Sequence, residues 1–113
     1  MILLQINFDI SPENQEAFEK MYINSYVPAL KKQHGYIGSK LMRIFPPGVT
    51  KEIAAAPAHF NYQLNLTFDT EENRRRWVDS REHQLVWPLA EGMAQGEVTW
   101  RGFDIVSTDA ALY

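Results

Sequence analysis

The sequence predicts a single α+β domain with the ferredoxin-like order β-α-β-β-α-β, in which two helices cover one face of a four-stranded antiparallel sheet. Three observations support this fold. Residues 2–10 and 60–68 alternate apolar and polar side chains, the period of strands with one buried face. Residues 12–34 and 71–91 instead repeat apolar side chains every three or four positions, as amphipathic helices do. One further strand-like segment follows each of the two helical segments.

Length and composition are those of an ordinary globular domain over residues 1–113. A net charge of -3 argues against a nucleic-acid partner, which requires a concentrated basic face. The absence of cysteine excludes disulfides and thiolate metal sites, and neither His34 nor His59 has a second metal ligand at a suitable spacing. No apolar run is long enough to cross a membrane and no signal peptide is apparent, so we expect a cytoplasmic protein with no membrane partner.

Local signals mark where the first helix begins and ends. Ser11 and Pro12 begin it after the first strand, because serine can cap free amides and proline presets φ. Pro28 should kink or end the helix near Tyr26, because proline removes a backbone hydrogen bond. Gly35 then ends the last turn.

The connection between the second strand, 35–45, and the third is long for a hairpin. A Pro-Pro-Gly run ends the strand, and the loop spans residues 46–59. An alanine run at 54–56 predicts a helical turn within it. The loop is either a mobile surface insertion or a functional lid, and the sequence leaves both interpretations open.

The second helix should be broken into two pieces, 71–79 and 81–91, because its pattern falters at Asp79 and Ser80. Either residue could cap the second piece, and Asp79 has the capping-box spacing to a glutamate three residues later. Pro88 should bend the second piece. The last strand is expected to follow, shortly after two glycines.

This topology places the first and third strands side by side in the middle of the sheet. Their apolar faces form the floor beneath the helices, and the opposite face carries amide side chains from both strands: Gln5, Asn7, Asn61, Gln63 and Asn65. A domain of this size rarely leaves a sheet face bare, so we expect a homodimer formed across it. The same amide layer is compatible with a wet dimer interior or with a ligand pocket.

Three segments of the chain are similar to one known family. They are the strand beginning at Ile2, the Gly-Tyr-Ile-Gly-Ser run at 35–39, and the pattern Trp77-x-x-Ser80-x-x-His83. On these segments the chain resembles the antibiotic biosynthesis monooxygenase family over nearly its whole length. The resemblance implies a dimeric α/β barrel, in which two ferredoxin-like sheets close into one barrel. The tryptophan–serine–histidine pattern occurs in members of many functions, so it points to fold more than to activity.

The resemblance also implies a chemistry. Cofactor-free oxygenases of the family oxidise anthrone-type phenols to quinones with O₂, and an asparagine and a tryptophan one helical turn apart are implicated. Asn73 and Trp77 match this pair, and their N–H groups could donate to a developing oxyanion or peroxide. His83 is a candidate base or hydrogen-bond partner, with a structural role at the helix break as the alternative. We therefore expect an oxygenase with no metal and no organic cofactor that acts on an apolar aromatic or polyketide-like compound.

A haem-degrading branch of the family suggests a less well supported alternative. Asn7 and Trp77 are compatible with the asparagine and tryptophan of that branch. The position of its iron-ligating histidine, ten residues after the tryptophan, holds Trp87, which departs from the pattern.

Several other residues have two interpretations. Tyr22, Tyr26 and Trp87 could line an aromatic-substrate cleft between helices and sheet, with Asn7 as a further binding residue, although core packing explains the aromatic residues equally well. Arg74–Arg76 are typical of a solvated helix face. The competing hypothesis for the whole chain is a non-catalytic ligand-binding or structural dimer, for which no residue needs a chemical role.

Overall fold

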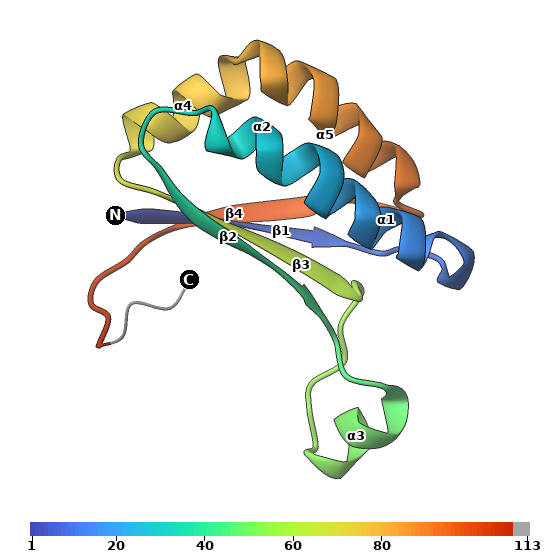
Figure 1. Cartoon of the computed structure of the whole chain (residues 1–113). Coiled ribbons are helices and arrows are strands. Elements are labelled where there is room, and N and C mark those ends of the chain that lie inside the picture. Colours follow the sequence, from blue (N-terminus) through green and yellow to red (C-terminus); the bar gives the residue numbers. More distant parts are fainter. Residues whose placement is uncertain (110–113) are drawn as a thin grey trace.

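The computed structural model of the chain describes residues 1–109 and has the predicted ferredoxin-like architecture. Its antiparallel sheet has the strand order β2-β3-β1-β4. The strands are β1 (Ile2–Phe8), β2 (Tyr36–Arg43), β3 (Tyr62–Phe68) and β4 (Thr99–Asp104). All of the longer helices lie on one face of the sheet (Figure 1). The prediction that the first and third strands are central neighbours is confirmed, since β1 pairs with β3 along its whole length.

The first helical layer is a continuous path of four short elements. They are a 3₁₀ turn (Pro12–Asn14), α1 (Gln15–Met21), a π-helical turn (Tyr22–Tyr26) and α2 (Val27–Lys31). The predicted irregularity near Tyr26 therefore takes the form of a wide turn rather than a break. A π turn accommodates Pro28 because it changes the hydrogen-bonding pattern just where proline has no N–H to donate.

The second helical layer is broken as the sequence predicts, into α4 (Glu71–Asp79) and α5 (Arg81–Met93). Ser80 is the cap. Its Oγ accepts from the His83 backbone N–H at 3.1 Å and donates to the Trp77 carbonyl at 2.6 Å. Serine satisfies one end of each helix at once, which is why the chain turns here and not at Asp79.

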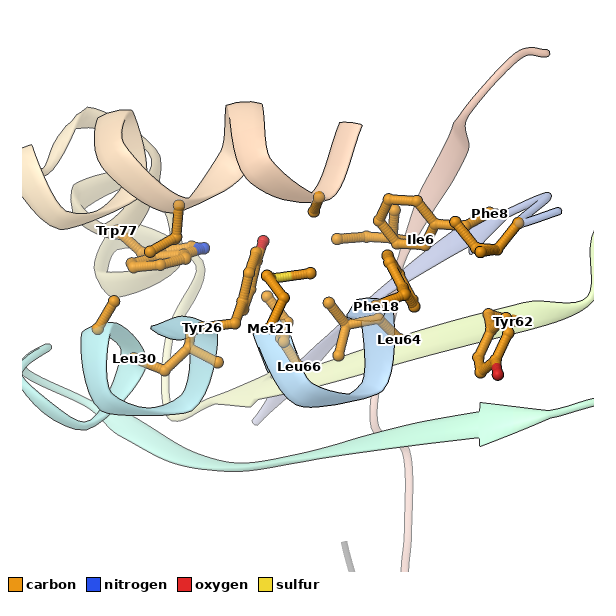
Figure 2. Packing of buried hydrophobic residues seen from close by; sticks show 14 of the residues in the cluster. Ile6, Phe8, Phe18, Met21, Tyr26, Leu30, Tyr62, Leu64, Leu66 and Trp77 are labelled. Carbon is orange, nitrogen blue, oxygen red and sulfur yellow. The ribbon is translucent and has the colours of Figure 1, made fainter. Parts of the chain in front are cut away.

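The core lies between the helices and the sheet (Figure 2). Strand β1 contributes Ile6 and Phe8, which stand opposite Leu64 and Tyr62 of β3. The largest fully buried side chain is Trp77 of α4. Aromatic rings meet at tilted angles throughout, for example where the ring centroids of Phe8 and Phe18 are 5.1 Å apart.

Three strand boundaries are shorter than predicted, and one strand contains a bulge. Strand β1 ends at Phe8 rather than residue 10, and β3 begins at residue 62 rather than 60. Between them the Asn61 side chain takes the place of a backbone partner, accepting from Ile10 N at 2.8 Å and donating to Ile10 O at 2.7 Å. In β2 the pairing register shifts between Tyr36 and Gly38, which turns Tyr36 onto the helix-facing side.

The long connection between β2 and β3 forms an arm that projects away from the sheet (Figure 1). Its helix is α3 (Pro47–Glu52), so the prediction of a helical turn at 54–56 is wrong. A proline at the first helical position favours the earlier start, and Ala54, with φ of 52°, lies in the left-handed region just after the helix.

Candidate functional site

A cavity of about 250 Å³ lies between the helical layers and the sheet. It is lined by side chains from β1, the π turn, α4, α5 and β4: Leu4, Ile6, Tyr26, Arg74, Trp77, Val78, His83, Trp87 and Trp100. Most of this surface is aliphatic or aromatic, with a small number of polar groups. This is the usual composition of a small-molecule site.

Tyr26 enters the cavity from the end of the π turn. Its ring is fully buried and meets the ring of Trp77 edge-on, with centroids 5.8 Å apart. Its hydroxyl is buried and has no hydrogen-bond partner among residues 1–109, although buried hydroxyls are normally paired. Figure 2 shows this hydroxyl on the side of the ring nearest Trp77 and α5. Burial raises the pKa of the Tyr26 hydroxyl, so it stays protonated and can donate.

His83 enters the same cavity from the first turn of α5. Its ring stacks on Trp87 at 5.9 Å with an interplanar angle of 8°, and the Trp77 ring meets it edge-on at 4.9 Å. Its Nδ1 is buried and has no partner in the described part of the chain. Burial lowers the pKa of His83, an effect that the charge of Asp79 partly opposes. The imidazole is therefore held neutral, the form in which one ring nitrogen accepts a proton.

Trp87 and Trp100 form the outer end of the cavity. Their rings meet edge-on at 6.1 Å, and Trp87 also contacts Phe8 in the core. Trp100 is 60% exposed, so one wall of the cavity mouth faces solvent. The predicted aromatic cleft is therefore present, and its outer wall comes from the last strand, which the sequence did not suggest.

Arg74 is the cavity residue that the sequence interpretation missed. The side chain is 23% exposed, against 72% for Arg75 and 63% for Arg76, so the prediction of one solvated arginine face is wrong for Arg74. The available signal was its spacing: Arg74 precedes Trp77 by three residues and Val78 by four, which places all three on one face of α4.

Asn73 does not line the cavity, which corrects the expectation that it pairs with Trp77 beside the cleft. It is buried on another side of α4, where its Nδ2 donates to Asp69 Oδ1 at 2.8 Å. Its backbone N–H is bonded to the Thr70 Oγ1 that caps the helix, at 3.1 Å. A Cβ built on Gly35 would lie 2.4 Å from Asn73 Nδ2, so this amide is packed against the turn that enters β2.

Tyr22 and Asn7 also lie outside the cavity. The Tyr22 hydroxyl is 2.7 Å from Ser39 Oγ, between the first helical layer and β2. Asn7 lies on the far face of the sheet, where it accepts from Gln63 Nε2 at 3.1 Å and donates to Thr99 Oγ1 at 3.4 Å. Of the seven residues predicted for the site, the cavity thus brings together Tyr26, Trp77, His83 and Trp87.

Comparison with known proteins adds similarity of fold. No family profile matches the sequence, and no curated protein matches it. Among solved structures, HapK from Hahella chejuensis superposes with a TM-score of 0.77 at 12% identity, covering 100% of both chains. A variant of SnoaB, a cofactor-independent oxygenase from Streptomyces nogalater, gives 0.71 at 12% identity over 96% of this chain and 95% of that one. A protein from Caulobacter crescentus assigned to the antibiotic biosynthesis monooxygenases gives 0.71 at 11% identity over 94% and 90%.

The chain therefore has the fold of the antibiotic biosynthesis monooxygenases. At these identities the likeness concerns the backbone alone, so the chemistry has to be argued from the cavity. Within residues 1–109, no group of three or more histidine, aspartate or glutamate side chains is arranged to hold a metal ion. None of the described helices combines the length and apolarity that a membrane span needs.

Proposed function

We propose that this protein is a small oxygenase that oxidises an apolar aromatic or polyketide-like phenol with O₂, using no metal or organic cofactor. The observation that carries the proposal is the pair of buried, unpartnered polar atoms, Tyr26 Oη and His83 Nδ1, in one aromatic-lined cavity. An unpaired buried polar atom costs about 1–3 kcal/mol, so two at one site are most simply explained by a ligand that pairs them.

His83 is the base in this proposal. Its neutral imidazole, with the proton on Nε2, can take the phenol proton at Nδ1. Tyr26 then donates to the oxyanion that forms, within apolar walls where such a hydrogen bond is stronger than in water. Trp77 and Trp87 hold the ring by edge and face contacts.

The reaction balances without a further reductant or oxidant. The phenolate passes one electron to O₂, and the resulting radical and superoxide combine into a carbon-bound peroxide. His83 returns its proton to the peroxide. The ring C–H proton then leaves as the O–O bond breaks, so one oxygen becomes a carbonyl and the other leaves as water. For 1-naphthol the sum is naphthol plus O₂ giving naphthoquinone plus water.

Oxygen uptake tests the proposal directly. The purified protein is mixed with a panel of phenols, from 1-naphthol to anthrone-type compounds, and both O₂ consumption and quinone absorbance are followed. His83→Gln should lower the rate by about 10²-fold or more, the usual range for loss of a general base. Tyr26→Phe should lower it by about 10²-fold if its hydroxyl donates to the oxyanion.

Tyr22→Phe is the matched control, because Tyr22 is bonded to Ser39 outside the cavity and should leave the rate unchanged. No uptake above the protein-free background with any phenol would refute the oxygenase proposal. Binding of the same phenols without turnover would instead favour a non-catalytic ligand-binding protein.

The proposed functional unit is a homodimer formed across the far face of the sheet. Met42 and Phe103 remain 39% and 45% exposed on that face, on the outer strands β2 and β4. At its centre the Asn65 Oδ1 is buried without a partner. Sedimentation equilibrium should give twice the monomer mass, and Phe103→Lys should shift the mass toward the monomer. A monomeric wild-type protein at micromolar concentration would refute this assembly.

A further inference from the structure

Arg74 differs from its two neighbours in a way that concerns the ligand. It lines the 250 Å³ cavity and also an adjoining hollow of about 280 Å³, and the two share Leu4 as well as Arg74. Its side chain thus separates an inner, mainly apolar space from an outer, more polar one. A basic residue in this position reaches a ligand that Arg75 and Arg76 on the solvent side cannot reach.

The guanidinium of Arg74 is held in place along one edge. Its Nε donates to Glu71 Oε2 at 3.0 Å, and its Nη2 donates to Glu71 Oε1. A guanidinium carries five N–H donors, so this bidentate contact leaves the edge bearing Nη1 available. No residue of the described chain accepts a hydrogen bond from Nη1.

The charges around the cavity favour an anion. Arg74 is the one permanently charged side chain among the described residues that line it, since burial keeps His83 neutral. The adjoining hollow, by contrast, is lined by Glu71 and Asp104 on its outer side. An anionic group is therefore attracted at the cavity side of Arg74 and repelled beyond it.

We infer that the cavity takes an aromatic carboxylic acid, with its ring against Trp77 and Trp87 and its carboxylate on the free edge of Arg74. This inference rests on the proposed ligand site and adds the charge of its substrate. The phenol oxygen of the same molecule faces Tyr26 and His83, so the two polar ends of the ligand are read by different residues.

The size of the cavity limits the ring system. A cavity of about 150 Å³ encloses benzene, and pockets for drug-sized ligands begin at about 300 Å³. At about 250 Å³ this cavity suits one ring or two fused rings with a small acidic substituent. A hydroxynaphthoic acid has these features.

Calorimetric titration with two probes of equal shape tests the inference. The probes are 2-naphthoate and its neutral isostere 2-naphthamide, each added to the wild-type protein, Arg74→Gln, Arg74→Lys and Arg75→Gln. Wild type and Arg75→Gln should bind the acid about tenfold or more tighter than the amide, the ratio expected for a charge-assisted hydrogen bond. Arg74→Gln should abolish this preference, and Arg74→Lys, which keeps the charge, should restore part of it.

The outcomes separate this inference from the oxygenase proposal. Equal binding of acid and amide by the wild type would overturn the inference while leaving an aromatic site in place. Loss of the preference in Arg75→Gln as well would also overturn it, because a general surface field would then be responsible. If neither probe binds the wild type, the acid site is refuted. Oxygen uptake with neutral phenols still tests the oxygenase separately. Thermal unfolding of each variant verifies that it is folded, and Arg74→Lys preserves the test if the glutamine variant is not.

Discussion

Tyr26→Phe should make the ligand-free protein more stable and less active at the same time. The Tyr26 hydroxyl is buried without a partner, whereas in the unfolded chain it is hydrated. Leaving such a group unpaired costs about 1–3 kcal/mol, and removing it returns most of that free energy, less the packing lost with one oxygen atom. We expect a net gain of about 1 kcal/mol in the free energy of unfolding.

This gain is measurable for a chain of this size. It corresponds to a rise in Tm of about 4 °C, and to an increase of about 0.3–1 M in the urea midpoint. Urea unfolding without ligand, followed by tryptophan fluorescence, gives the free energy, and oxygen uptake gives the activity. Tyr22→Phe is the control: its hydroxyl is paired with Ser39 at 2.7 Å, so its loss should destabilise the fold by about 1 kcal/mol.

The opposite sign would refute the reasoning. If Tyr26→Phe destabilises the protein as much as Tyr22→Phe does, the Tyr26 hydroxyl is paired in solution. It would then give no support to a ligand. Stabilisation with undiminished turnover would instead show that the hydroxyl is unpaired but takes no part in the reaction.

Three further predictions concern the elements that hold the site. Gly35→Ala should cost about 2 kcal/mol or more in urea unfolding, because its φ is +81° and a Cβ would lie 2.3 Å from Asp69 Oδ1; Gly96→Ala, with the same φ but open space, should cost about half as much. An equal loss in the two variants would contradict the close approach. Ser80→Ala should destabilise by about 1 kcal/mol through loss of the cap, and Ser80→Thr should keep most of it. The lowered pKa of His83 means that the unfolded chain binds its proton more readily, so stability should fall as pH drops below about 6.5 and level off below the folded pKa. His83→Gln should remove this part of the pH dependence, and an unchanged profile would contradict the assignment.

The sequence was sufficient to predict the fold because its periodicities are local. Alternation over 2–10 and 60–68 and the helical repeats around them require only that each element bury one face. The break between α4 and α5 was equally readable, since capping depends on residues a single turn apart. Boundaries were less accurate where a side chain from elsewhere acted as a backbone partner, as Asn61 does for Ile10.

The site depended on information that no local pattern contains. Asn73 and Trp77 are one turn apart, yet Asn73 packs against Gly35 while Trp77 faces the cavity, because each side of α4 meets a different neighbour. Arg74 stands beside two arginines of the same chemical type and differs from them only in what α4 covers. The sequence by itself determined the elements, their order and the aromatic character of the space between helices and sheet. Only the tertiary structure decided which polar groups are buried there without a partner, because pairing and burial depend on residues that are distant in sequence.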